Sequence, residues 1–206
     1  MAEYAKSARI RAGIIDACAR VFKESGFHGS SMAQIARDAE ISYTGLLHHF
    51  PRKEQLLTAV LDLEDQRRAA FLREHRTFAA DADPVQVLRE LSAMLLDRRT
   101  EPGLIQLTAV LVGEATSTAH PAHEHFVARF ANIRSFLTRL FTRLHDEGRT
   151  SGALSPAEMA AVTIATIDGL QTQWLFTPAE IDTEKLVRGL LSVLVPELAQ
   201  DADRGM

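Results

Sequence analysis

The sequence predicts an all-α protein of about nine helices, because apolar residues recur at three- and four-residue spacing along most of its length. No stretch of strand length alternates apolar and polar residues between hairpin signals, so a β-sheet is not expected. Between residues 31 and 53, two short helices and a tight turn are packed into about twenty residues. These observations predict a three-helix N-terminal domain at residues 1–50 and a larger helical domain at residues 51–206.

The composition is that of an ordinary globular protein, with 206 residues, 46% hydrophobic and 24% charged. The chain has no run of about 18 apolar residues, and its first residues lack an apolar signal segment. We therefore expect a cytoplasmic protein that has no membrane partner. The single cysteine, Cys18, cannot form an internal disulfide and is expected to be a small core residue.

The charge is distributed unevenly along the chain, although the net charge is only −4. Residues 1–53 hold eight Lys and Arg against five Asp and Glu, a net charge of +3, and the remaining residues have a net charge of −7. A DNA-binding domain needs local cations rather than a basic whole protein. The pattern therefore agrees with a nucleic-acid-binding N-terminal domain, although chance clustering of surface charge would also produce it.

A first helix is expected over residues 5–25, ending at Gly26. The two short helices follow, with Ser31 and Ser42 as their N-caps and Gln34 completing a capping box with Ser31. In the second short helix, Leu46 and Phe50 stand one turn apart and should face inward. The residues left facing outward are polar, aromatic or small: Tyr43, Thr44, Gly45 and His48. This pattern is typical of a helix-turn-helix, whose second helix enters the DNA major groove.

A spaced set of residues across this region resembles the TetR family of bacterial transcriptional regulators. The residues that carry the resemblance are Gly26-Phe27, Ser30-Ser31-Met32, Ile35-Ala36, Ile41-Ser42, Leu46, His48, Phe50-Pro51 and Lys53-Glu54. The later part of the chain is similar to the family in its helix count, its length and its stretch at residues 168–174. The resemblance implies a homodimer that binds double-stranded operator DNA and a small-molecule effector.

Two residues depart from the family pattern. Glu40 stands where the family usually has Gly, and a left-handed conformation without Gly costs roughly 1 to 2 kcal/mol, so we expect a slightly altered turn. Leu47 stands where the family usually has a Tyr that touches the DNA backbone, so that contact is not carried over.

The DNA-binding residues predicted from the motif and the resemblance lie on the second short helix and beside it. Tyr43 and Thr44 can reach base edges, and Gly45 leaves room for close approach of the backbone. Phosphate contacts are expected from His48, from Lys53 at the start of the next helix, and from the Ser31 hydroxyl group. The full set is Ser31, Ser42, Tyr43, Thr44, Gly45, His48 and Lys53. The alternative is that these are ordinary surface residues of a helical bundle.

Six further helices are expected after residue 50. One starts at Pro51 and continues to about residue 78, and the next follows Asp83-Pro84. Residues 101–103 separate that helix from one that passes through Leu107 and Ala115. Pro121 starts another, which Gly148 ends. The last two follow the Ser155-Pro156 capping box and Thr183.

The last two helices are apolar over a wider arc than one protomer's core requires. Paired with the same helices of a second copy, they would form a four-helix bundle. The predicted dimer-interface residues are Ile164, Ile167, Leu186, Leu190, Val193 and Leu194.

A ligand pocket inside the second domain is implied mainly by the resemblance. Small-molecule sites are mostly apolar with a few polar groups, and the candidate residues fit that description, although plain core packing is the alternative. They are Phe71, Leu107, Leu111, Glu114, Phe126, Phe130, Gln171 and Trp174. Their pattern does not indicate which ligand is bound.

His120, His123 and Glu124 could share one face of a helix that starts at Pro121, but His125 would point elsewhere. Because zinc requires three or four converging ligands, we expect no metal and no cofactor. The sequence has no P-loop, G-x-S-x-G, H-E-x-x-H or dinucleotide motif, so an enzyme is not expected.

The sequence therefore predicts a homodimeric transcriptional regulator, a repressor that a small apolar or amphipathic ligand releases from a palindromic operator. The first alternative is a dimeric DNA-binding regulator without a small-molecule effector. The second is an all-α enzyme that reuses the N-terminal domain.

Overall fold

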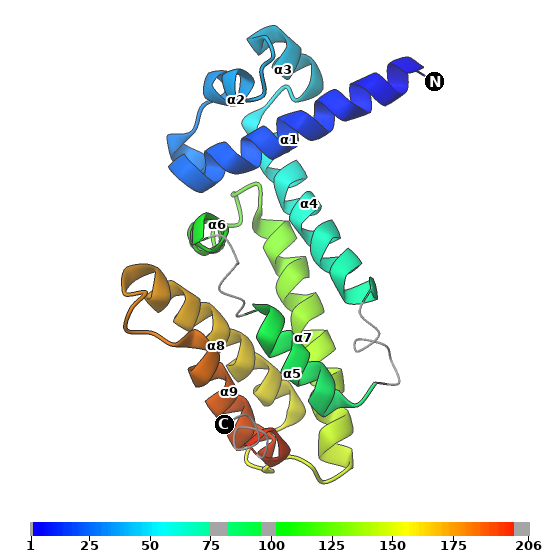
Figure 1. Cartoon of the computed structure of the whole chain (residues 1–206), viewed down its shortest axis with the longest axis vertical. Coiled ribbons are helices and arrows are strands. Elements are labelled where there is room, and N and C mark those ends of the chain that lie inside the picture. The colour runs from blue at the N-terminus through cyan, green and yellow to red at the C-terminus, as the bar shows by residue number, and fades with distance from the viewer. Residues whose placement is uncertain (1, 75–81, 96–101, 200–206) are drawn as a thin grey trace. The chain divides into compact units, whose positions relative to one another are not determined.

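The computed structural model describes residues 2–74, 82–95 and 102–199 (Figure 1). Over these ranges it contains nine α-helices, one short 3-10 helix and no strand, which confirms the predicted all-α class. The helices are α1 (Ala2–Gly29), α2 (Met32–Asp38), α3 (Tyr43–His49), α4 (Lys53–Glu74), α5 (Pro84–Leu95), α6 (Pro102–Glu114), α7 (His123–Asp146), α8 (Pro156–Phe176), α9 (Thr183–Leu194) and the 3-10 helix η2 (Pro196–Ala199).

The chain forms two compact units. The first comprises Met1–Ala70 and Gln106–Phe126, and the second comprises Phe71–Ile105 and Val127–Met206. The helices α4, α6 and α7 contribute residues to both units. A compact unit need not coincide with a functional domain, so the division at residue 50 remains a prediction about function.

In the first unit, α1 packs against α2, and α2 packs against α3 (Figure 1). The apolar side chains of α1 form the centre of this unit together with residues from the next three helices: Ile14, Cys18, Val21, Phe22, Ile35, Leu46, Phe50, Leu56 and Leu57 are all buried. Burial raises the pKa of the Cys18 thiol, which agrees with its predicted role as a core residue. On the surface, the Arg20 guanidinium donates two hydrogen bonds to one Asp38 oxygen and joins α1 to α2.

The α1 helix is interrupted at Gly26, as the sequence predicts. Gly26 has φ +69° and ψ 175°, after which the helix resumes as far as Gly29. Glycine adopts a positive φ at little cost, because it has no Cβ to clash with the backbone.

The turn between α2 and α3 keeps the left-handed residue that a helix-turn-helix requires, and here that residue is Glu40, with φ +55°. The expected alteration of this turn is therefore wrong. Two backbone hydrogen bonds close the turn, one from Ala39 N to Ile35 O (2.9 Å) and one from Ile41 N to Ala36 O (3.0 Å). The turn thus retains its geometry, and Glu40 carries the conformational strain.

Two helices start later than the sequence predicts. The α4 helix begins at Lys53 rather than Pro51, because Arg52 occupies the cap: its N–H donates to Gln55 Oε1 (3.3 Å) and its carbonyl accepts from Gln55 N (3.2 Å). The α7 helix begins at His123 rather than Pro121, since the preceding turn is closed by Ala122 N donating to His120 Nδ1 (3.2 Å). The predicted end of the α4 helix, near residue 78, lies outside the described residues.

The start of α6 also differs from the prediction. The sequence predicts that residues 101–103 separate two helices, but Pro102 is the first residue of α6 and Gly103 lies within that helix. Proline is well tolerated at a first helical position, because its missing N–H has no partner there.

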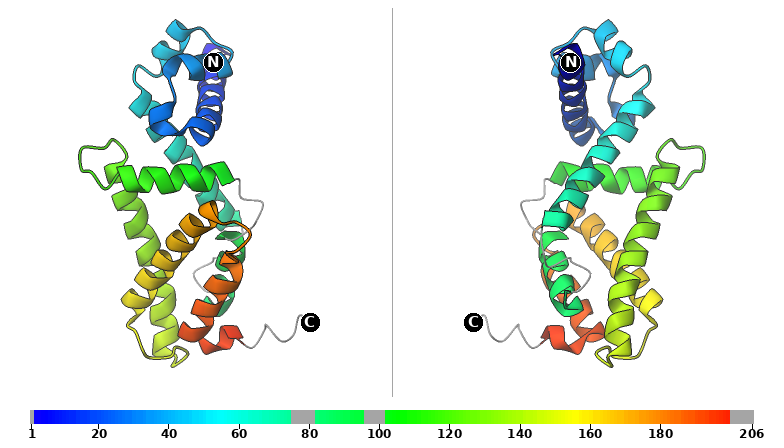
Figure 2. Two further views of the ribbon diagram at one scale, coloured as in Figure 1. Left: turned by 90° about the vertical axis from the view of Figure 1, so that its left-hand side faces the viewer. Right: turned by 90° about the vertical axis from the view of Figure 1, so that its right-hand side faces the viewer.

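In the second unit, the apolar faces of α5, α7, α8 and α9 share one core. Its buried side chains include Leu88, Leu137, Phe141, Leu144, Met159, Val187 and Leu191. Figures 1 and 2 show α8 and α9 side by side, and α9 also packs against α5 and η2. The Ser155–Glu158 capping box is formed in both directions, and Gly148, with φ +68°, follows the end of α7. Both features confirm the sequence analysis.

Among the described residues, no helix is both long and apolar enough to cross a lipid bilayer.

Candidate nucleic-acid interface and cavities

The outward face of α3 carries the side chains that the sequence predicts for DNA contact. Thr44 and His48 are exposed, and about half of the Tyr43 side-chain surface is accessible (51%). Leu46 and Phe50 face the core and are almost completely buried. The helix therefore has one face fixed by packing and another face free to meet a groove.

The two capping serines lie at the N-termini of the short helices. Ser31 Oγ accepts from Gln34 N (3.1 Å), and Ser42 Oγ accepts from Gly45 N (3.0 Å). Each hydroxyl group has one donor and two acceptor positions. Each serine can therefore keep its cap and still donate its hydrogen to a phosphate oxygen.

Gly45 has a local structural role that sequence analysis missed. A Cβ atom at this position would lie 3.0 Å from Ser42 Oγ, the atom that caps α3. A larger residue would push against that cap, so glycine preserves the start of the helix. This role does not conflict with the predicted close approach of the backbone to DNA.

The side chain of Lys53 is partly buried and is fixed by contacts within the protein. Its Nζ atom donates to Ser30 O (2.6 Å) and lies 4.6 Å from the centre of the Phe27 ring. Burial lowers the pKa of Lys53, although the negative charge of Glu54 acts in the opposite direction and raises it. Lys53 thus ties the start of α4 to the α1–α2 junction. An ammonium group has three donors, so a phosphate contact remains a prediction.

The predicted ligand residues are divided between the two units. Leu107, Leu111 and Phe126 are buried in the first unit, and Glu114 is partly exposed there. Phe130, Gln171 and Trp174 are half-buried in the second unit, and the side chain of Phe71 lies outside the described part of the structure. No single described cavity gathers the eight residues, so their shared pocket remains a prediction.

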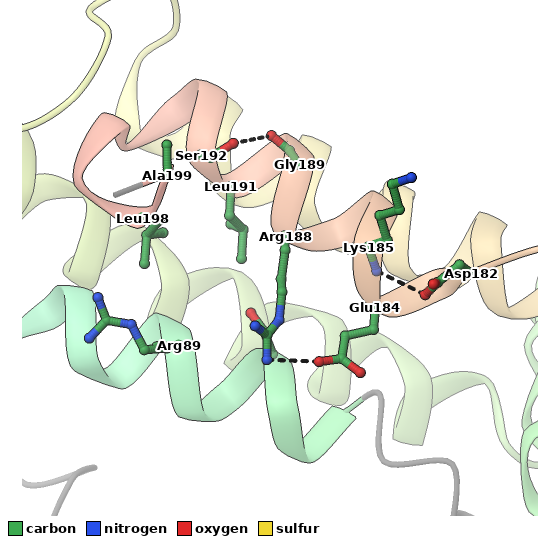
Figure 3. A pocket seen from close by; sticks show the side chains of 11 residues that line it. Arg89, Asp182, Glu184, Lys185, Arg188, Gly189, Leu191, Ser192, Leu198 and Ala199 are labelled. Atoms are coloured by element: carbon green, nitrogen blue, oxygen red, sulfur yellow. Dashed lines mark hydrogen bonds and ion pairs between the residues drawn. The ribbon is translucent and has the colours of Figure 1, made fainter. Parts of the chain in front are cut away.

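The larger of the two cavities described here has a volume of about 620 Å³ and lies in the second unit between α5, α9 and η2. None of the predicted ligand residues lines it. Figure 3 shows Leu191 and Leu198 directed toward α5, with Arg89 and Arg188 on either side of them. Each arginine binds a neighbour on its own helix: Arg89 donates to Gln86 (2.8 Å), and Arg188 pairs with Glu184 (2.7 Å).

The smaller cavity has a volume of about 310 Å³ and lies in the first unit, between the last residues of α1 and the α6 helix. Leu107 and Glu114 are the two predicted ligand residues that line it. Sequence analysis did not anticipate a cavity here, because it depends on the break at Gly26 and on the packing of helices about eighty residues apart.

The histidines near the start of α7 point to different partners. His123 Nδ1 lies 2.8 Å from Ala115 O, His120 Nε2 lies 3.6 Å from Glu114 Oε2, and His125 Nε2 lies 3.5 Å from Asp65 Oδ2. The expected common face of His120, His123 and Glu124 is not formed, because His120 precedes the helix. Within the described ranges, no group of three or more His, Cys, Asp or Glu residues is arranged to hold a metal ion.

The predicted dimer residues differ in their exposure. Val193 and Leu186 are exposed on α9, whereas Ile164, Ile167 and Leu190 partly pack against the core of their own chain. Leu194 is buried in that core, one heptad after the buried Val187, so it exposes little surface of its own and its assignment to the interface stays a prediction. Sequence analysis missed two exposed apolar residues of α8, Val162 and Phe176, of which Phe176 is 83% exposed.

Two family models match the chain. One, described as bacterial regulatory proteins of the tetR family, matches residues 14–60, and the other, described as the C-terminal part of BetI-type transcriptional repressors, matches residues 97–198. The regulator AcrR of Shigella flexneri is 23% identical over 192 residues, which cover 90% of this chain and 87% of AcrR.

Solved structures of regulators share the fold. NalD of Pseudomonas aeruginosa, the secondary repressor of a multidrug efflux pump, superposes with a TM-score of 0.68 at 22% identity, covering 92% of this chain and 98% of NalD. FadR of Bacillus subtilis, solved in complex with stearoyl-CoA, gives a TM-score of 0.71 at 19% identity, covering 89% and 97%.

The capped α2 and α3 helices, the left-handed turn between them and the exposed polar face of α3 define a helix-turn-helix DNA-binding protein. The two family models match the N-terminal and the C-terminal parts of the chain, and with this fold they identify the family. This chain belongs to the TetR family of bacterial transcriptional regulators.

Proposed function

We propose that this regulator is a homodimeric repressor, which binds a palindromic operator through the α3 helices of its two protomers and is released by a small apolar or amphipathic ligand. The observation that carries the proposal is the free face of α3, with Tyr43, Thr44 and His48 directed away from the core. A helix of this kind docks in the major groove, where side chains can distinguish all four base pairs.

The proposed dimer is supported by the exposed apolar residues of α8 and α9. Val162, Phe176, Leu186 and Val193 would each lose contact with water if these helices packed against their copies. Burial of apolar surface contributes about 25 cal/mol per Å², and a closed two-fold pair uses the same patch twice. Two recognition helices would then be available for two half-sites of one operator.

The proposed ligand response is supported by relatives rather than by a defined pocket. The solved FadR structure holds stearoyl-CoA, an amphipathic molecule. A ligand shifts DNA binding only by its different affinity for the DNA-binding and released states, and couplings of about 1 to 3 kcal/mol change affinity roughly 5- to 150-fold. Operator DNA must weaken ligand binding by the same factor.

The test is selection of binding sites from random-sequence DNA by the full-length protein, followed by affinity measurements at several salt concentrations. We expect a palindromic consensus and an affinity that falls steeply with salt, because bound cations release counterions from phosphate. Thr44→Ala should alter the preferred bases, with about 1 to 3 kcal/mol of discrimination at stake. Thr116→Ala, an exposed threonine after α6, is the matched control. Selection of no consensus, or an unchanged consensus for Thr44→Ala, would refute the assignment of α3.

A further inference from the structure

The cavity between the last residues of α1 and α6 has the size and lining of a small-ligand site. Its volume of about 310 Å³ is at the lower end of the range for ligand pockets, about 300 to 1,000 Å³. Apolar walls come from Phe22, Phe27, Leu107 and Val110. At Gly26 the cavity is open, because a Cβ atom built there would meet nothing within 4 Å.

Glu114 is the acidic group of this cavity that lies deepest in the fold, and its two oxygens have different surroundings. Oε2 is buried and lies 3.6 Å from Nε2 of His120, a side chain that is only 10% exposed and packs edge-on against Phe27. Neither of these two atoms has a hydrogen-bond partner among the described residues. Oε1 contacts His28 Nε2 at 2.9 Å, and His28 is itself a lining residue.

His28 holds Oε1 only weakly. Its side chain is 71% exposed, and contacts of this kind at a protein surface contribute little, because water competes for both partners. His120 encloses the other oxygen, so the carboxylate stays in position if His28 moves away. Oε1 is therefore the exchangeable position of the site.

The charges that line the cavity favour a cation. Among the lining residues, Glu24 and Glu114 contribute two carboxylates, whereas Lys23 contributes one ammonium group. The Lys53 ammonium also lies beside the Phe27 ring, but it is not a lining group and it is hydrogen-bonded to Ser30 O. A bound molecule that places a positive donor at Oε1 would form a charge-assisted hydrogen bond, which is stronger than a neutral one. Its apolar part would cover Leu107 and Val110.

We propose that the α1–α6 cavity is a second ligand site, which takes a small aromatic molecule bearing one amine or amidine group. The cationic group binds Glu114 Oε1 in place of His28, and the ring lies against Leu107 and Val110. Because α1 packs against α2, the occupant replaces a contact between the DNA-binding helices and α6 and lowers DNA affinity. This last consequence, unlike binding itself, rests on the proposed function.

Benzamidine is a suitable probe, since it combines a phenyl ring with an amidinium group, and benzyl alcohol is its neutral counterpart. Calorimetric titration of the full-length protein should show one saturable benzamidine site per chain and at least about ten-fold weaker binding of benzyl alcohol. Glu114→Gln should weaken benzamidine binding about ten-fold or more. Glu184→Gln, the same chemical change in the larger cavity, should leave the affinity within about two-fold of wild type.

A second variant keeps the proposal testable if Glu114→Gln does not fold. Val110 is exposed at the edge of the cavity, so Val110→Trp should fill the space and abolish benzamidine binding without disturbing the core. Circular dichroism establishes folding in each case. Absence of saturable binding to wild type, or wild-type affinity in either folded variant, would overturn the proposal.

Affinity for DNA selected from the random library separates this inference from the proposed function. We expect benzamidine to weaken DNA binding by wild type at least about five-fold and by Val110→Trp not at all. If the protein selects no DNA but benzamidine binding follows the predicted pattern, the proposed function fails and the site stands. If DNA is bound and benzamidine occupancy leaves its affinity unchanged, the coupling part of the proposal fails.

Discussion

At the scale of single residues, Glu40 shows how the turn of the helix-turn-helix motif is enforced by its surroundings. A left-handed non-glycine residue is strained because its Cβ approaches a backbone oxygen, and the cost is roughly 1 to 2 kcal/mol. The chain accepts this cost at φ +55°, since the hydrogen bonds on either side and the burial of Ile35, Ala36 and Leu46 fix the turn. Tertiary packing therefore overrides the preference of a non-glycine residue for a negative φ.

Glu40→Gly should therefore stabilise the protein. Removing the Cβ relieves the strain, and the greater freedom of glycine in the unfolded chain offsets part of the gain, so the free energy of unfolding should rise by about 1 kcal/mol. Glu40→Ala retains a Cβ and serves as the control, with little change expected. Denaturant unfolding measures both variants. A glycine variant less stable than wild type, or an equal gain for alanine, would show that the turn is unstrained.

The contacts of Lys53 could not be predicted from the sequence. Its position after Phe50-Pro51 identifies it as the start of a helix, and the motif suggests a phosphate contact. Its hydrogen bond to Ser30 O joins residues 23 positions apart and depends on how α1 meets α2. Sequence spacing carries no information about such a contact, because it is set by tertiary packing.

At the scale of helices, the sequence predicts best where the determinants are local. The Ser155–Glu158 capping box and the Gly26 and Gly148 stops each depend on a few neighbouring residues, and all three are formed. The helix starts predicted at Pro51 and Pro121 are wrong, because proline suits both a turn and a first helical position. At both places, a side chain that hydrogen-bonds to the backbone favours a turn before the helix: Gln55 before α4 and His120 before α7.

The apolar residues of α9 show a further limit of prediction from sequence. Apolar periodicity identifies which residues avoid water, but it does not separate those buried in one chain from those free to meet a second copy. Leu194 belongs to the core of its own chain, whereas Val193, one position earlier, is 67% exposed. The dimer test must therefore use Val193.

Val193→Glu should convert the proposed dimer into monomers, because two-fold symmetry places one carboxylate from each chain in the same apolar seam. Ser192→Glu introduces the same side chain at the adjacent residue, which lines the α5–α9 cavity, and should leave the dimer intact. Sedimentation velocity at micromolar concentration distinguishes the two states. The proposed interface would be wrong if wild type were monomeric or if both variants behaved alike.

A network around Arg149 joins the ends of three elements in the second unit. Its guanidinium group donates to both oxygens of Glu197 (2.7 and 2.8 Å), to Glu147 (2.7 Å) and to Asp83 (3.1 Å). The hydrogen bonds from Arg149 lower the pKa of Glu197 below its ordinary value of 4.5. Because the folded-state pKa is the lower one, the stabilisation is present above pH 4.5 and is lost as the pH falls through the folded-state pKa.

Glu197→Gln should reduce the dependence of stability on pH below pH 4.5, since the variant has no carboxylate to protonate at this position. Thermal unfolding of both proteins between about pH 3 and pH 7 measures the effect. The stability difference should be largest near neutral pH and should shrink on acidification. A difference independent of pH would show that Arg149 does not stabilise the ionised form of Glu197.

At the scale of the whole molecule, charge is divided along the sequence: residues 1–53, which include the helix-turn-helix, have a net charge of +3, and the remaining residues have a net charge of −7. Attraction to phosphate therefore acts in the region that contains α3, and we propose that the remainder of the chain serves dimerisation and ligand binding. A palindromic operator requires two recognition helices that meet successive major grooves, about 34 Å apart along the DNA. We propose that ligands act by changing that spacing, with the α4 helices linking the two functions.

The most direct test of the central claim is chemical footprinting of the full-length dimer on its selected DNA, with probes that report major-groove contacts. We expect two protected major-groove patches on one face of the duplex, with centres about 10 base pairs or a multiple of that distance apart, and loss of these base contacts in Thr44→Ala with the phosphate contacts retained. A single patch, protection confined to the minor groove, or base contacts unaffected by Thr44→Ala would contradict this claim.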